Sequence, residues 1–164
     1  MSVVEIHLDL VSIQGESLSS AHPNEIEVDS FSWGVSNSAV NTQSGGIKGG
    51  KVSMKEITVT KSFDKASAQV LKAVATGQIF KTARISWSKS TGGKRPEDFV
   101  VITLTGVLIT SVEQNSTRTG EGMGTESVTL AFDKISLDYK VQDKTGLLIS
   151  AGQMAYDLAQ GKSS

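Results

Sequence analysis

The chain has 164 residues and a formal net charge of −1, with 20% charged and 38% hydrophobic residues, as in an ordinary globular domain. This balance excludes a general nucleic-acid binder, which needs a basic surface. The absence of cysteine excludes disulfides and thiolate metal sites, and it predicts folding in a reducing compartment.

The first predicted strand lies near the N-terminus. Ile6, Leu8 and Leu10 alternate with polar residues, which is typical of a strand with one side facing water. Glu5 and Asp9 interrupt the apolar run and no basic region precedes it, so the segment does not have the pattern of a signal peptide. No stretch reaches the roughly 20 apolar residues of a membrane span, so we expect no membrane insertion.

In the next predicted strand, the alternation changes phase at Asp29–Ser30. One extra residue at this point predicts a β-bulge, which would return the later apolar side chains to the core. The residues expected to point inward are Ile26, Val28, Phe31, Trp33 and Val35. The residues expected on the opposite, small and polar side are Ser30, Ser32, Gly34 and Ser36.

Residues 37–50 are predicted to form the longest loop, because they are rich in Gly, Ser and Asn and show no apolar period. A loop of this length in a compact domain is usually functional or disordered. Strand character resumes at residues 51–63, where the apolar alternation again changes phase.

Residues 67–77 predict the one clear helix. Ser67 is expected to cap its N-terminus, which makes Ala68 the first helical residue, and Gly77 suits the left-handed position after its end. The apolar stripe consists of Val70, Leu71 and Val74. A helix this short depends on packing against the sheet.

The remaining residues predict further strands. These are strands at 83–90, 99–112 and 127–139, with a hairpin loop at 91–98 and a polar, Gly-rich loop at 115–126. No linker divides the chain, so residues 1–164 are predicted to form a single domain.

No pattern in the chain indicates catalysis or a cofactor. His7 and His22 lack metal-ligand spacing and are interpreted as surface or turn histidines, and the acidic residues are dispersed. No nucleophile, phosphate-binding or dinucleotide motif is present, so we expect no enzyme, no metal and no cofactor. The expected core anchors are Phe31, Trp33, Leu71 and Trp87.

Several segments resemble, in order, the haemolysin-coregulated protein (Hcp) family, the tube proteins of the bacterial type VI secretion system. The segments are "GES" at 15–17, "HPNEIEVDSFSWGVS" at 22–36, "GGKV" at 49–52, "FDKASAQVLKAVATGQ" at 63–78 and "TESVTLAFDKISLDYKVQD" at 125–143. The C-terminal "AYDLA" resembles the family's W-D-I-A ending, with Tyr156 in place of Trp. The preceding "GLLISAGQM" departs from the family's Gly-Gly-Pro-rich run.

The resemblance implies a mainly β fold, a compact β-barrel of two sheets with one short α-helix. It implies that six copies close into a ring and that rings stack into a tube. It also implies assembly in the cytoplasm, then secretion without a signal peptide, with sheath and spike proteins as partners and effector proteins carried in the lumen.

The resemblance also implies site residues. Ser32 matches the family's lumen-facing effector contact, and Ser30 and Ser36 are expected beside it. The extended loop is expected to touch a neighbour in the ring or stack through Asn41, Thr42, Gln43, Ser44, Gly45, Gly46, Lys48 and Gly49.

Two alternatives remain open from the sequence. One is the tail-tube protein of a phage or phage-like contractile injection particle, which shares the fold. The other is a monomeric β-barrel that binds a small ligand.

Overall fold

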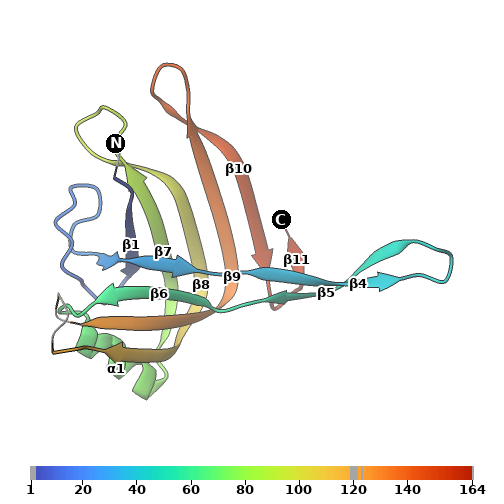
Figure 1. Ribbon diagram of the computed structural model, residues 1–164, viewed down its shortest axis with the longest axis horizontal. Coiled ribbons are helices and arrows are strands. Elements are labelled where there is room, and N and C mark those ends of the chain that lie inside the picture. The colour runs from blue at the N-terminus through green and yellow to red at the C-terminus, as the bar shows by residue number, and fades with distance from the viewer. Residues whose placement is uncertain (1–2, 119–121, 123, 164) are drawn as a thin grey trace.

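A computed structural model describes residues 3–118, 122 and 124–163 of a mainly β protein with one short helix, as predicted (Figure 1). The first strands are β1 (Glu5–Leu10), β2 (Ile26–Val28), β3 (Ser30–Ser32), β4 (Val35–Asn41), β5 (Ile47–Met54) and β6 (Ile57–Ser62). Helix α1 (Ser67–Thr76) is followed by β7 (Ile79–Lys89), β8 (Glu97–Asn115), β9 (Thr125–Gln142), β10 (Leu148–Asp157) and β11 (Lys162–Ser163). Within these described ranges, no helix combines the length and the apolar character needed to cross a membrane.

The described strands form one large antiparallel sheet and one separate hairpin. The nine-stranded sheet has the order β11-β10-β9-β8-β7-β1-β2, and β6 joins it by pairing with both β9 and β3. Residues 26–32 connect its two sides, because β2 pairs with β1 while β3 pairs with β6. Among the described residues the sheet is not closed by strand pairing, but this chain connection between β2 and β3 brings its two sides around a single apolar core and gives it a barrel-like shape.

The change of phase at Asp29 is a change of partner strand and not the predicted β-bulge. The Asp29 amide donates to the Thr60 carbonyl at 2.7 Å, at the point where the chain leaves β1 and joins β6. Phe31 and Trp33 are half-buried and pack against the core. Val35 is 48% exposed, so the prediction that it points inward is wrong: the chain has already entered β4, which has no core beneath it.

Residues 37–50 form most of a β-hairpin and not the irregular loop that the sequence predicted. Strand β4 pairs with β5 from Val35↔Met54 to Asn41↔Ile47, and a tight turn closes it, with Gly45 at φ 88°. Nearly every side chain on both faces is exposed. Because neither face covers a core, the hairpin carries no apolar period. It projects from the rest of the molecule (Figure 1).

Strands β8 and β9 turn a corner together at Gly106 and Asp133, which lie opposite each other. The buried side chains shift by one position on both strands, from Leu104 to Val107 and from Phe132 to Ile135. Gly106 has φ 64°, and a Cβ there would collide with the Asp133 carboxylate. The two strands curve along their length (Figure 1), and the buried side chains before and after the shift face the same core.

Helix α1 begins one residue earlier than predicted. Ala66 is the N-cap and Ser67 the first helical residue, while Gly77 at φ 65° ends the helix as expected. The helix buries Val70 and Ala73. Leu71 is 41% exposed, so its prediction as a core anchor is wrong, because the small helix turns only one narrow side to the sheet.

A buried ion pair lies between β6 and β9, and a hydrogen bond from Ser67 connects it to α1. Nζ of Lys61 lies 2.5 Å from Oε1 of Glu126 and 3.0 Å from Oδ1 of Asp64. Glu126 also accepts hydrogen bonds from Oγ of Ser67 at 2.5 Å and from Nε2 of Gln114 at 2.7 Å. Burial alone would raise the pKa of Glu126, but these hydrogen bonds and the Lys61 charge outweigh it and hold the pKa below its usual range.

We expect Lys61→Met to lower the free energy of unfolding by about 3–5 kcal/mol, because it leaves the buried Glu126 carboxylate without its countercharge. The double variant Lys61→Met/Glu126→Leu should recover most of that loss, since it removes both charges. Urea denaturation measures both. A single variant no less stable than the double variant would contradict the role of the pair.

Candidate functional site

The outward side of β3, β6, β9 and β8 is covered by hydroxyl groups. Two rows cross the strands, Ser30↔Thr60↔Ser127 and Ser32↔Thr58↔Thr129. Between them, the intervening side chains of β6 and β9 point into the core and are buried. The surface that we call the hydroxyl face consists of Ser30, Ser32, Thr58, Thr60, Ser111, Ser127 and Thr129.

The hydroxyl face is polar but nearly uncharged. Oγ of Ser30 and Oγ1 of Thr60 are 2.5 Å apart, and the Oγ1 atoms of Thr58 and Thr129 are 3.3 Å apart. A hydroxyl has one proton to donate and two lone pairs, so each group keeps capacity for a further partner. Two carboxylates add charge at the border: Glu113, opposite Ser127, and Glu56, which accepts a hydrogen bond from Oγ1 of Thr110 at 3.2 Å. The face can therefore form many weak, exchangeable contacts without a deep pocket.

The structure divides the three serines of the predicted lumen contact. Ser30 and Ser32 are exposed within the hydroxyl face. Ser36 is exposed but lies on β4, where it pairs with Ser53 in the separate hairpin. The sequence analysis missed the hydroxyls of β6, β8 and β9, although "TVTKS" and "SVT" alternate hydroxyl and other residues with period two.

The residues of the predicted contact loop lie together in the outer half of the hairpin. They are exposed apart from the half-buried Thr42, whose Oγ1 accepts a hydrogen bond from the Gly46 amide at 3.0 Å. Exposed apolar side chains accompany them, including Ile47 at 81% and Val40 at 47%. Their contact with another copy stays a prediction here.

Both histidines are buried, so the interpretation of His7 as a surface residue is wrong, whereas His22 lies in a turn, as expected, but is buried there. Residues 11–25, the covering segment, lie over the polar side of β1, and His7 and His22 are only 2% and 6% exposed. The two rings stack with centroids 4.9 Å apart. The side chain of Ser17 is hydrogen-bonded to Nε2 of His7 at 3.0 Å. The polar side of β1 faces protein because a later stretch of chain folds over it.

The Ser17–His7 pair does not form a catalytic site. Ser17 is buried, and Nδ1 of His7 has no carboxylate or other hydrogen-bond partner to orient it among the described residues. A serine nucleophile needs access to substrate and an oriented base. In the same described part of the chain, no cluster of histidine and acidic side chains could hold a metal ion.

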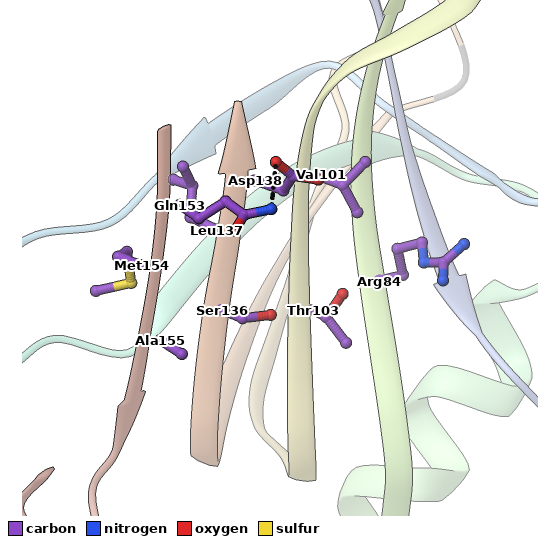
Figure 2. A pocket seen from close by; sticks show the side chains of 9 residues that line it. All are labelled: Arg84, Val101, Thr103, Ser136, Leu137, Asp138, Gln153, Met154 and Ala155. Atoms are coloured by element: carbon purple, nitrogen blue, oxygen red, sulfur yellow. Dashed lines mark hydrogen bonds between the residues drawn. The ribbon is translucent and has the colours of Figure 1, made fainter. Parts of the chain in front are cut away.

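A shallow hollow of about 510 Å³ lies on the outer side of β7–β10 (Figure 2). Arg84, Thr103 and Ser136 line it with Asp138, whose carboxylate accepts a hydrogen bond from Nε2 of Gln153 at 3.5 Å. None of these groups forms a nucleophile–base pair in the geometry shown. The hollow offers a contact surface and no evident chemistry.

Comparisons with known proteins agree along most of the chain. The model of the family described as "Type VI secretion system effector, Hcp" matches residues 6–139. Protein Hcp1 of Pseudomonas aeruginosa is 33% identical over 143 residues, which cover 87% of each chain.

Two solved structures extend this similarity to the fold. A type six secretion system protein superposes with a TM-score of 0.90 and 26% identity, covering 99% of this chain and 100% of that chain. Hcp1 from Salmonella typhimurium superposes with a TM-score of 0.75 and 26% identity, covering 98% and 99%.

We expect Thr58→Val and Thr129→Val to change the free energy of unfolding by no more than about 1 kcal/mol, because each removes one weak, half-exposed hydrogen bond. The matched control is Val59→Thr, which places a hydroxyl in the core without a partner and should destabilise by about 1–3 kcal/mol. Urea denaturation compares the three variants. Equal losses would contradict the assignment of the two sides of β6.

Proposed function

Because the chain belongs to the Hcp family of type VI secretion proteins, which are secreted, structural tube proteins and not enzymes, we propose that six copies close into a ring. Rings stack into a tube that carries effector proteins in its lumen. Assembly takes place in the cytoplasm, and the tube leaves the cell without a signal peptide. Sheath and spike proteins of the secretion apparatus are its further partners.

The β4–β5 hairpin is the observation that carries the proposal of assembly. A two-stranded hairpin in water is marginally stable by itself. This one extends beyond the core and exposes Val35, Val40, Ile47 and Val52. A neighbouring copy that covers these side chains would stabilise the hairpin and bury apolar area in the same step.

The hydroxyl face is proposed as the wall of the lumen. Small hydroxyl side chains present no deep apolar pocket, so a passenger protein can dock without a fixed hydrophobic anchor and can leave again. Ser32, which matches the family's effector contact, lies in this face, and Thr58 opposite it extends the same chemistry.

The two alternatives make different predictions. A tail-tube protein of a phage-like particle would be encoded beside capsid and terminase genes, whereas the family model favours the secretion system. A ligand-binding barrel would be a monomer at all concentrations. Light scattering of the purified protein, followed by negative-stain imaging, tests assembly directly: six-subunit rings support the proposal, and a monomer at every accessible concentration overturns it.

We expect Ile47→Lys to reduce the fraction of protein in rings by at least about tenfold, because the charge must be desolvated in the contact. Leu18→Lys is the matched control, since Leu18 is 95% exposed and lies off the hairpin. Light scattering over a concentration series measures both variants. If the control disrupts rings as strongly as Ile47→Lys, the hairpin is not the specific contact.

We expect Ser32→Gln to weaken retention of co-expressed effectors while leaving ring formation unchanged, because the longer side chain projects from the hydroxyl face into the lumen. Ser150→Gln is a matched exposed change on β10, outside that face. Co-purification of effector with rings provides the measurement. Loss of rings in Ser32→Gln would show that Ser32 is structural instead.

A further inference from the structure

The covering segment, residues 11–25, is closed on itself by backbone hydrogen bonds between its earlier and later residues. The Gly15 amide donates to the Asn24 carbonyl at 2.8 Å, and the Ser17 amide donates to the Glu25 carbonyl at 3.0 Å. A Cβ on Gly15 would lie 2.5 Å from the Glu25 carbonyl oxygen and 2.6 Å from the Cα of Ile26 on β2, so Gly15 packs closely against the start of the sheet. The segment is thus a small closed unit that can be held to the sheet or released from it.

The layer beneath the covering segment is polar. His7 faces Ser86 across the β1–β7 pair, and Ser88 lies two residues further along β7 on the same side. All three are buried, yet Nδ1 of His7 and the hydroxyls of Ser86 and Ser88 have no partner among the described side chains. Ile13 anchors the start of the segment in the apolar core, whereas hydrogen bonds and charges dominate the contact around the two histidines.

His22 is the main polar link between the covering segment and the sheet. Its Nδ1 donates to Oε2 of Glu25 at 2.8 Å, and its Nε2 donates to Oδ1 of Asp98 on β8 at 2.6 Å. Both ring nitrogens face carboxylates, so both carry a proton and the ring is cationic. The hydrogen bonds to Asp98 and Glu25 raise the pKa of His22 to about 10.

Unlike His22, His7 favours the neutral form. Burial, and then the charge of His22 beside it, lower the pKa of His7 below 6.5. A proton on Nδ1 would have no acceptor there and would add a second positive charge to the stack. The stacked pair is therefore stable with one charge only, on His22.

We propose that the stacked His7–His22 pair is a latch that holds the covering segment closed while the pair carries one charge, and that gaining a second charge or losing the first releases the segment. The release exposes the polar sides of β1 and β7 and leaves the remaining sheet in place.

The surrounding charges come from every element around the pair. Glu5 on β1, Glu27 on β2 and Glu25 favour a proton on His7, but burial and His22 outweigh them. Asp98 on β8 holds His22, while the residues of β7 that face His7 directly are uncharged serines. A further charged pair, Asp9↔Arg84, lies two residues along the β1–β7 pairing, on the same side as His7.

The plot of the opening constant against pH has two rising parts, an acid limb and an alkaline limb. In the open state, with the segment released from β1, the pKa of each ring returns to the ordinary value near 6.5. Below that pH, only His7 differs in protonation between the closed and open states. The opening constant therefore rises by up to about tenfold per pH unit as the pH falls. Between about pH 6.5 and pH 10, only His22 differs in protonation between the closed and open states. The opening constant therefore rises by up to about tenfold per pH unit as the pH rises.

Hydrogen exchange of the peptide spanning residues 11–25 tests the latch in the full-length protein. Rates from about pH 5 to pH 9, corrected for intrinsic exchange, give the opening constant, and this window lies above the ordinary carboxylate range. The wild-type protein should open least near pH 6.5, with a rise on both sides, while exchange of the β9 core stays constant.

Variants separate the two limbs. His7→Phe, which keeps a ring stacked on His22, and His7→Gln should each flatten the acid limb and keep the alkaline limb, whereas His22→Gln should remove the alkaline limb. Ser86→Ala, in the same layer, should leave the shape of the profile unchanged. A wild-type profile that is flat with pH, or an acid limb that persists without His7, would overturn the proposal.

Discussion

The side chains of a strand alternate with period two, so a sheet that surrounds one core must shift its alternation wherever it turns, and this constraint shapes the whole molecule. At Gly106 and Asp133 the alternation of buried side chains shifts in both β8 and β9. Gly106 permits this corner, since its φ is positive and a Cβ there would collide with the Asp133 side chain. At Asp29 the chain instead leaves one partner strand for another. These two corners decide which side chains point outward on each half of the sheet.

The hydroxyl face is open to solvent, whereas the polar side of β1 is covered by the covering segment, and the two surfaces hold different polar groups for this reason. On the open surface, groups such as Thr58 and Thr60 can exchange hydrogen bonds with water at little cost, so hydroxyls suffice there. Beneath the covering segment water is largely excluded, and a charge needs fixed partners. His22 has them in Glu25 and Asp98, whereas His7 is stable there only without a charge.

The hairpin is a part of the described structure whose exposed apolar side chains its own chain does not cover. Its strands extend past the core, so they gain no burial from their own chain, and side chains such as Ile47 remain exposed. The described part of the chain offers no comparable arrangement for chemistry, since its one serine–histidine contact is sealed from solvent. An exposed apolar hairpin beside a described surface without catalytic geometry fits the Hcp family, whose members are secreted tube components.

The sequence alone determined the β class, the short helix, the family and the place of Ser32 on a polar surface, because these depend on local alternation and on quoted motifs. Only the tertiary structure decided which strand each segment pairs with. It turned a Gly-rich loop into a hairpin, joined serines and threonines from distant strands, and buried His7 under residues that follow it in the chain. Alternation shows that a strand has two sides, but it cannot show what later folds over either side.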